Sequence, residues 1–264
     1  SATNRLLATF AITCNTDKDL RMKRNQILGL VPARGGSKGL PGKNLKLLDG
    51  VPLVAHSVRV SQACEAISRT ICSTDDDEIA RTASEYGAEV PFKRPAAMAA
   101  DTSTDADYAL HAVEWLRDNE GWTPDILVIL WPTCPLRSAQ QVAEAVDILE
   151  GDPDADSVVS VVNPAKSPYK MWRRTTSKYL VPLLTSEVFE QFAGPRQRLP
   201  EVLAPNGYVH GVRTSTLLRT KSVLGLRVLP YKMDAAECVD IDTEEDLAKA
   251  ESLLRRRRTD TINS

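Results

Sequence analysis

The 264-residue chain lacks several features that mark common classes of protein. No apolar run approaches the length of a membrane span. The net charge of −2 creates no overall field that would attract nucleic acid or a membrane surface. No internal repeat is visible. The composition, with 42% hydrophobic and 26% charged residues, is that of an ordinary soluble globular protein, and the length suits one large α/β domain or two small ones.

Cysteine and histidine are too scattered to form a recognisable site. The five cysteines are odd in number and include no C-x-x-C pair, so they predict reduced thiols in a cytoplasmic protein rather than zinc ligands or disulfides. The three histidines show no ligand spacing, and no Ser/His/Asp or Cys/His set stands out. His210 is alone on a predicted strand, where a structural role competes with that of a general base.

Two common phosphate-binding motifs are missing, yet the chain has a loop rich in glycine and cations. Residues 28–44 read LGLVPARGGSKGLPGKN, which is neither a P-loop nor a G-x-G-x-x-G fingerprint. Glycines let backbone N–H groups approach phosphate oxygens. Arg34 can bind phosphate through its planar fork, while Lys38 and Lys43 supply compact charges. The loop therefore predicts a polyphosphate site, with a solvated surface loop as the alternative.

Strand-like apolar runs alternate with helix-like segments along most of the chain. This alternation predicts a three-layer α/β fold with a mostly parallel sheet covered on both faces. The predicted strands span residues 27–31, 70–73, 88–92, 125–130, 157–162, 208–213 and 226–229. The predicted helices span residues 52–66, 76–86, 104–119 and 138–150, and a last helix is capped by Thr243.

Two segments depart from this alternation. Residues 1–26 predict a flexible N-terminal extension with a natural start near Met22, and an ordered N-terminal arm is the alternative. Residues 27–264 then form one domain. Within it, residues from about 164 to 205 contain several prolines and mixed polarity, which predicts an inserted arm or small subdomain.

A pair of carboxylates late in the chain predicts a metal site. Asp240 and Asp242 are separated by one residue, and at a strand end alternate side chains share one face. Mg²⁺ favours one or two carboxylates together with substrate oxygens, and Mn²⁺ is an alternative ion. The structural reading is that Asp240 only ends a strand and Asp242 only precedes the cap of the last helix.

Several of these stretches together resemble the acylneuraminate cytidylyltransferase (CMP-sialic acid synthetase) family. The loop matches A-R-x-x-S-K-G-x-x-x-K-N, residues 239–247 match the family's late motif, and residues 132–137 match its P-T-S-P-L-R turn with Cys134 in place of Ser. Arg94-Pro95 and Asp101-Thr102 fit the stretch beside its nucleotide pocket. The matches run from residue 27 to about residue 254.

The resemblance implies a nucleotide-diphospho-sugar transferase-like (Rossmann-like) fold and a nucleotidyltransferase that moves CMP from CTP to the anomeric hydroxyl of an α-keto acid sugar, releasing pyrophosphate. It also implies a homodimer in which the arm contributes to the partner's acceptor site. The implied catalytic residues are Arg34, Lys38 and Lys43, and the metal ligands are Asp240 and Asp242. The implied nucleotide-binding residues are Ala33, Arg34, Gly35, Ser37, Lys38, Lys43, Asn44, Arg69 and Ser73, and the implied acceptor-binding residues are Trp131, Lys170, Arg196 and His210.

The acceptor half departs from the family pattern. Trp131 stands where a Gln usually contacts sialic acid, which replaces amide hydrogen bonds by a large apolar plane. Residues 208–210 read Tyr-Val-His, whereas family members often show a small residue and then a Tyr two positions later. A changed acceptor sugar is therefore expected. The alternatives are a sugar-1-phosphate nucleotidylyltransferase and a non-catalytic nucleotide-binding relative.

Overall fold

A computed structural model describes residues 25–37, 39–176, 178–188 and 190–263, with side chains as far as residue 258. Its centre is a six-stranded sheet in the order β10-β6-β9-β5-β1-β4. Neighbouring strands run parallel except at β9, which is antiparallel to β5 and to β6. The six strands are β1 (Ile27–Pro32), β4 (Arg69–Ser73), β5 (Ile126–Ile129), β6 (Ser157–Val162), β9 (Ala204–Arg213) and β10 (Val228–Lys232).

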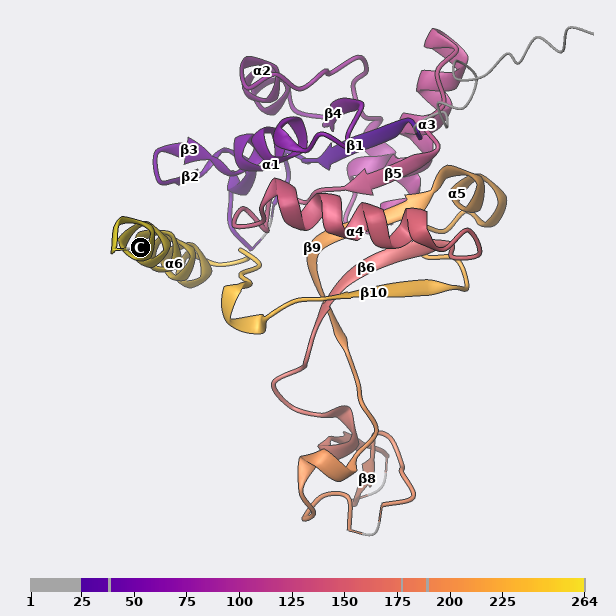
Figure 1. Ribbon diagram of the computed structural model, residues 1–264, viewed down its shortest axis with the longest axis vertical. Coiled ribbons are helices and arrows are strands. Elements are labelled where there is room, and N and C mark those ends of the chain that lie inside the picture. Colours follow the sequence, from indigo (N-terminus) through magenta and orange to yellow (C-terminus); the bar gives the residue numbers. More distant parts are fainter. Residues whose placement is uncertain (1–24, 38, 177, 189, 264) are drawn as a thin grey trace, which may run out of the picture.

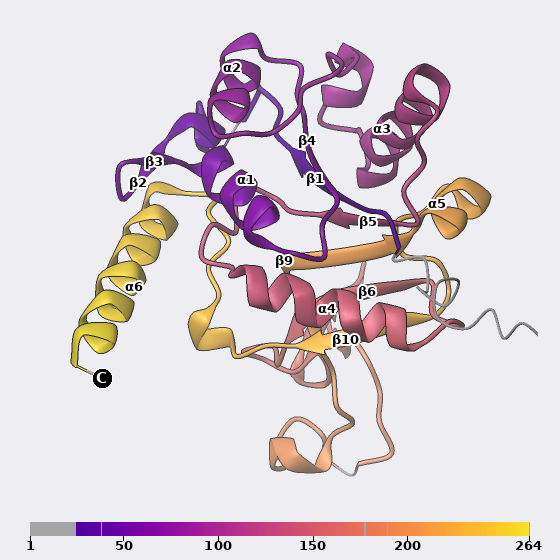
Figure 2. The same ribbon diagram turned by 45° about the horizontal axis from the view of Figure 1, so that its top comes forward.

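Helices cover both faces of this sheet, so the predicted three-layer fold is confirmed (Figures 1 and 2). Alternate residues of β1 and β5 point into two separate cores. One core contains Ile27 and Val31 with side chains of α1 and α4, and the other contains Leu28 and Leu30 with side chains of α3 and α5. The helices are α1 (Leu53–Ala63), α2 (Asp77–Glu85), α3 (Asp105–Glu120), α4 (Ala139–Gly151), α5 (Thr214–Thr220) and α6 (Glu244–Asn263).

The helix ends follow the signals in the sequence. Ser138 and Gln141 form the predicted capping box at the start of α4. Asp76 accepts hydrogen bonds from two backbone N–H groups at the start of α2, and Gly87 follows the end of that helix with φ of 99°. In the part of the chain that the structure describes, no helix has the length and apolar character needed to cross a membrane.

Two predictions of strand structure are wrong. Residues 88–92 form only an isolated bridge between Glu89 and Ile71, because Pro91 lacks the N–H that a continuing ladder would need. Asp240 and Asp242 do not follow a strand directly. A 3-10 helix (Ala235–Glu237) and an irregular stretch separate them from β10.

The inserted arm leaves the sheet after β6 and returns through β9, and Figure 1 shows it protruding from the body of the molecule. It contains a hairpin of β7 (Trp172–Arg174) and β8 (Leu180–Pro182). The Trp172 and Phe192 rings stack with centroids 3.7 Å apart. Other short elements are β2 (Leu47–Leu48), β3 (Val51–Pro52) and 3-10 helices at Lys43–Leu45, Ala96–Ala99, Pro168–Lys170 and Arg196–Arg198.

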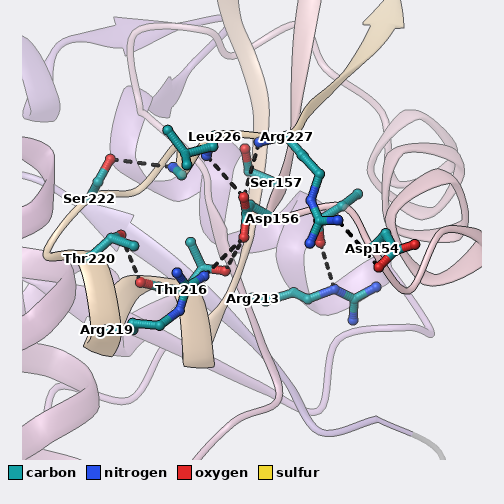
Figure 3. Close-up of polar contacts among 12 residues, drawn as sticks. Asp154, Asp156, Ser157, Arg213, Thr216, Arg219, Thr220, Ser222, Leu226 and Arg227 are labelled. Atoms are coloured by element: carbon teal, nitrogen blue, oxygen red, sulfur yellow. Dashed lines mark hydrogen bonds and ion pairs between the residues drawn. The ribbon is translucent and has the colours of Figure 1, made fainter.

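A buried carboxylate organises the edge of the sheet where β6 begins (Figure 3). Asp156 is 7% exposed and accepts hydrogen bonds from the N–H groups of Leu226 (2.9 Å) and Arg227 (3.0 Å) and from the Thr216 hydroxyl (2.8 Å). These bonds, with the Arg227 N–H first, lower the pKa of Asp156. The network joins the start of β6 to α5 and to the loop before β10.

Candidate functional site

Three segments that are far apart in the sequence meet at the carboxyl end of the parallel strands. The glycine-rich loop follows β1, the turn at residues 132–137 follows β5, and the D-x-D segment crosses between them. The Ile241 N–H donates to the Thr133 carbonyl over 2.8 Å. Gly39 packs so closely on the D-x-D backbone that a Cβ there would lie 3.1 Å from the carbonyl oxygen of Asp242. The structure thus joins the predicted phosphate loop to the predicted metal ligands.

Lys43 and Asp242 form the direct link between these segments. Their Nζ and Oδ1 atoms lie 2.8 Å apart. The Lys43 side chain is only 14% exposed, whereas that of Asp242 is 68% exposed. Lys43 is therefore held at a fixed position by its surroundings, and the Asp242 carboxylate remains open to solvent on its other side.

Asp240 has an unfavourable electrostatic environment. Although part of the residue faces solvent, protein atoms displace water from its carboxyl group, and this desolvation raises its pKa. The neighbouring Asp242 charge raises the pKa further, while a Thr133 hydrogen bond and the Lys43 charge oppose the shift. The Cys134 thiol lies 3.9 Å from the Asp240 carboxylate. A divalent cation would relieve the repulsion, so these two carboxylates fit a Mg²⁺ site.

Among the described residues, Asp240 and Asp242 are not part of a larger group of metal-binding side chains. Over residues 25–258, apart from positions 38, 177 and 189, no group of three or more His, Cys, Asp or Glu side chains is arranged to hold a metal. A cation at Asp240 and Asp242 would therefore take its other ligands from substrate or water, as Mg²⁺ commonly does.

Arg34, at the same edge of the sheet, has partners other than the Lys43–Asp242 pair. Its guanidinium forms an ion pair with Asp101 (3.0 Å) and donates to the Ala99 carbonyl (3.3 Å). Two hydrogen bonds hold the backbone of the loop. The Asn44 side-chain amide donates to the Arg34 carbonyl, and the Gly35 N–H donates to the Asp75 carboxylate. The Ser37 N–H donates to the Gly35 carbonyl over 3.2 Å, so the amides of both Gly35 and Ser37 are already bonded. Lys38 lies outside the described residues.

A cavity of about 240 Å³ opens beside Arg34. Arg94 lies in its wall, is 4% exposed, and donates to the Ser73 hydroxyl over 3.0 Å. Ser73 is itself fully buried and its carbonyl accepts from the Ala33 N–H, so Ser73 and Ala33 form the frame of the cavity rather than its surface. The cavity is lined by Pro32, Arg34, Arg94, Met98, Ala100, Asp101, Ser103, Asp105, Tyr108 and Trp131.

Tyr108 and Asp105 are members of this wall that the sequence alone does not single out. They lie three residues apart on the first turn of α3. From the sequence, Tyr108 is expected to be one of the buried apolar residues on the inner face of this helix. The Tyr108 hydroxyl donates to Asp105 over 2.5 Å and accepts from the Trp131 indole N–H over 3.2 Å. The only sequence signal is the nearby Asp101-Thr102 match.

His210 lies next to Trp131 in the interior. The two ring centroids are 5.9 Å apart, and the His210 Nε2 is hydrogen-bonded to the Val223 carbonyl over 2.8 Å. His210 is buried, and this burial lowers its pKa. The ring is therefore a neutral packing partner of Trp131.

The arm residues predicted to bind the acceptor lie apart from Trp131 and His210. Lys170 donates to the Gly194 carbonyl over 2.6 Å, and Arg196 donates to the Pro164 carbonyl over 2.6 Å. Arg196 also lines a separate cavity of about 500 Å³ within the arm. Because the arm protrudes from the sheet, a single chain does not assemble the four predicted acceptor residues (Figure 1).

Arg69 lies at the opposite edge of the sheet from the loop. It begins β4, whereas Ser73 ends that strand, and four strand residues span roughly 13 Å. Its guanidinium binds Glu89 (2.9 Å) and Glu120 (2.6 Å) and lies over the Trp122 ring. The structure thus corrects the sequence reading that placed Arg69 beside a nucleotide.

Comparison with known proteins identifies the family. The N-acylneuraminate cytidylyltransferase of Escherichia coli is 28% identical over 244 residues, covering 91% of this chain and 55% of that protein. The CMP-N,N'-diacetyllegionaminic acid synthase of Legionella pneumophila is 31% identical over 230 residues, covering 87% of this chain and 96% of that protein. The predicted resemblance is confirmed.

The fold agrees with this assignment. The structure of CMP:2-keto-3-deoxy-manno-octonic acid synthetase complexed with CTP superimposes with a TM-score of 0.64 at 17% identity, covering 88% of this chain and 99% of that one. The predicted nucleotide-diphospho-sugar transferase fold is therefore confirmed. The sequence model of the family described as "Cytidylyltransferase" matches residues 28–166. The chain belongs to the cytidylyltransferase family and is a nucleotidyltransferase.

Proposed function

We propose that this enzyme transfers CMP from CTP to the anomeric hydroxyl of a nonulosonic acid. The hydroxyl oxygen attacks the α-phosphorus and loses its proton, the bond from the α-phosphorus to the bridging oxygen of the β-phosphate breaks, and pyrophosphate leaves. The observation that carries the proposal is the contact of the glycine-rich loop with the D-x-D segment through Lys43 and Asp242. The relatives named for CMP-sialic and CMP-legionaminic acid support the class of acceptor.

The loop binds the triphosphate in this proposal. Lys43 and Arg34 exchange their present carboxylate partners for phosphate oxygens, and Lys38 and Ser37 belong to the same loop. Cations directed at the charge that develops on the phosphates lower the barrier most when they are already in place. The limited exposure of Lys43 supports this role.

Asp240 and Asp242 would hold Mg²⁺, or Mn²⁺ as an alternative. A divalent ion bound there would neutralise charge on the phosphates of the nucleotide. The raised pKa of Asp240, whose first cause is desolvation and whose next is the Asp242 charge, supports a cation at this point. Before the nucleotide binds, Lys43 pairs with the Asp242 carboxylate of this site.

The nucleoside occupies the Arg34 and Arg94 end of the 240 Å³ cavity, and the acceptor approaches the Trp131 end. Arg94 lies beside the end of β4, close to the loop, whereas Trp131 follows β5 on the side of β9. Ala33, Gly35, Asn44 and Ser73 support the nucleotide through the loop and strand backbone. Arg69 is not part of this proposal.

The arm completes the acceptor site of a second copy in a homodimer. Its exposed apolar side chains favour such a contact, and Lys170 and Arg196 offer the cations that an acceptor carboxylate needs. The exposed side chains are Met171, Trp172, Tyr179, Leu180, Leu183 and Leu184. The four cysteines in the described part of the chain are free thiols, which supports a cytoplasmic location.

A pyrophosphate-release assay with a substrate panel tests the proposal. CTP is paired with a series of nonulosonic acids, and each of the four nucleoside triphosphates is paired with sugar-1-phosphates. We expect pyrophosphate only from CTP with a nonulosonic acid. Turnover confined to a sugar-1-phosphate would favour the alternative nucleotidylyltransferase, and CTP binding without any turnover would favour a non-catalytic relative.

A further inference from the structure

We infer that Tyr108 is a positioning residue that fixes the indole of Trp131 in the substrate cavity and thereby sets the fit of the acceptor sugar. This inference rests on the proposed function, because it assigns the Trp131 end of the cavity to the acceptor. It adds a residue that itself need not touch substrate and that acts through a hydrogen bond to one that does.

The hydrogen bonds of the Tyr108 hydroxyl define its orientation. The hydroxyl has one proton, and Asp105 accepts it over 2.5 Å. A lone pair of the same oxygen then faces the indole N–H of Trp131, which donates to it over 3.2 Å. Asp105 therefore orients the phenol, and the phenol orients the indole.

The surroundings keep this arrangement fixed. Tyr108 is 6% exposed, and the Arg94 guanidinium lies 4.8 Å above its ring. Burial, followed by the Asp105 charge, raises the pKa of Tyr108 well above 10, so the hydroxyl keeps its proton. These contacts hold the phenol in the orientation in which its oxygen accepts the hydrogen bond from Trp131.

Trp131 is held at three points but still reaches the cavity. Its indole N–H is bound by Tyr108, its ring lies beside His210, and its carbonyl accepts from Ser57 over 3.2 Å. The same side chain lines the 240 Å³ cavity. An aromatic plane fixed in one orientation selects ligands by shape more sharply than a ring that can turn.

The order of the strands places Trp131 on the acceptor side. The phosphate loop follows β1, Trp131 follows β5, and His210 lies on β9. Because β9 carries the chain back from the arm, Trp131 stands between the loop cations and the strand that leads to the arm. If the indole loses its fixed orientation, the KM for the acceptor should therefore rise more than the KM for CTP.

The kinetic test is Tyr108→Phe in the full chain, with the nonulosonic acid that wild type uses best. We expect the KM for the acceptor to rise about five- to tenfold, the range for one lost neutral hydrogen bond, with the KM for CTP within about twofold of wild type. Tyr231→Phe is the matched control, because its hydroxyl also donates to a carboxylate, Glu144, over 2.6 Å but lies on β10 away from the cavity.

A double-mutant cycle separates positioning from general loss of structure. In a Trp131→Phe background, Tyr108→Phe should add less than about twofold to the acceptor KM, because the bond it removes is already absent. Independent effects that multiply in the double variant would overturn the inference. So would an equal rise in the KM for CTP and for the acceptor.

A spectroscopic readout tests the bond without any acceptor. With ¹⁵N-labelled tryptophan in the full chain, Trp131→Phe assigns the Trp131 indole signal. That signal should move upfield in proton shift in Tyr108→Phe and stay in place in Tyr231→Phe. An unmoved signal would overturn the inference. If wild type accepts no sugar of the panel, the proposed function fails, and the role of Tyr108 in selecting an acceptor fails with it; a moved signal would then establish only the hydrogen bond.

Discussion

Two carboxylates at opposite edges of the sheet have opposite environments. Asp156, where β6 begins, accepts from two backbone N–H groups and a hydroxyl, and these bonds lower its pKa. Asp240, near the ends of β1 and β5, is desolvated beside another carboxylate, and its pKa is raised. A carboxylate satisfied by its own protein stabilises the fold, whereas one left in repulsion beside converging cations is suited to a ligand.

The largest effect on turnover should come from a substitution at Asp242, the second carboxylate of the proposed metal pair. Asp242→Asn removes a negative charge from the proposed metal pair and weakens the contact with Lys43. We expect kcat to fall by at least about a thousandfold while thermal unfolding stays cooperative. Steady-state kinetics and calorimetry on the same sample measure both quantities. A rate like that of wild type would remove the metal proposal.

Lys43→Ala tests the other half of the same contact. Loss of one preorganised cation at the phosphates should lower kcat by about two to three orders of magnitude. Lys232→Ala is a suitable control, since this lysine also forms a carboxylate pair, with Glu201 over 2.7 Å, but on the far strand β10. A normal kcat with a raised KM for CTP would show that the loop only binds the nucleotide.

Much of this site can be predicted from the sequence, for a simple reason. The carboxyl ends of parallel strands lie along one edge of a sheet, so a loop after one strand and a turn after another lie near each other. The signatures at residues 28–44 and 132–137 therefore indicate the position of the site. The D-x-D pair reaches the same edge even though it does not follow a strand directly.

The remaining features depend on packing that the sequence does not express. Tyr108 has the spacing of a core residue, and its partner Trp131 lies 23 positions away. Arg69 is correctly predicted to lie at a strand, but it lies where that strand begins. The phosphate loop lies at the other edge of the sheet, where the parallel strands end. The separation of Lys170 and Arg196 from Trp131 follows from the β6–β9 pairing that sends the arm outward.

Asp156→Asn should lower stability and leave turnover unchanged, which is the converse of the result expected for Asp242→Asn. An amide at this position turns a hydrogen-bond donor toward groups that are themselves donors, and it lacks the negative charge. We expect Tm to fall by about 5 °C with kcat and KM unchanged below the transition. Thermal melts and assays at 25 °C measure the two effects. A loss of turnover in the folded variant would break the proposed contrast between the two edges.

The pH dependence of stability sharpens the same contrast. Because the folded pKa of Asp156 is depressed, its contribution is fully present above the unfolded pKa, near 4, and is lost as the pH falls toward the folded value. Wild type should therefore lose stability on acidification below about pH 4, and Asp156→Asn should lose less over that interval. Parallel pH profiles for the two proteins would contradict this assignment.

The smallest expected effect concerns the pair between Arg34 and Asp101. Both side chains are partly exposed, and such pairs contribute about 0–1 kcal/mol. If Arg34 must leave Asp101 to bind phosphate, Asp101→Asn should lower the KM for CTP by about two- to threefold. Asp154→Asn, which weakens an exposed pair with Arg227 at the opposite edge, should leave that KM unchanged. A raised KM in Asp101→Asn would instead indicate that Asp101 supports the nucleotide.

The central claim is that the edge containing Lys43, Asp240 and Asp242 transfers CMP. The most direct measurement quantifies CMP-sugar and pyrophosphate formed by wild type from CTP and nonulosonic acids, before and after removal of divalent ions and again after Mg²⁺ is restored. We predict equal amounts of the two products, loss of both on chelation, and recovery with Mg²⁺. Undiminished turnover after chelation, or pyrophosphate formed only with a sugar-1-phosphate, would contradict the account.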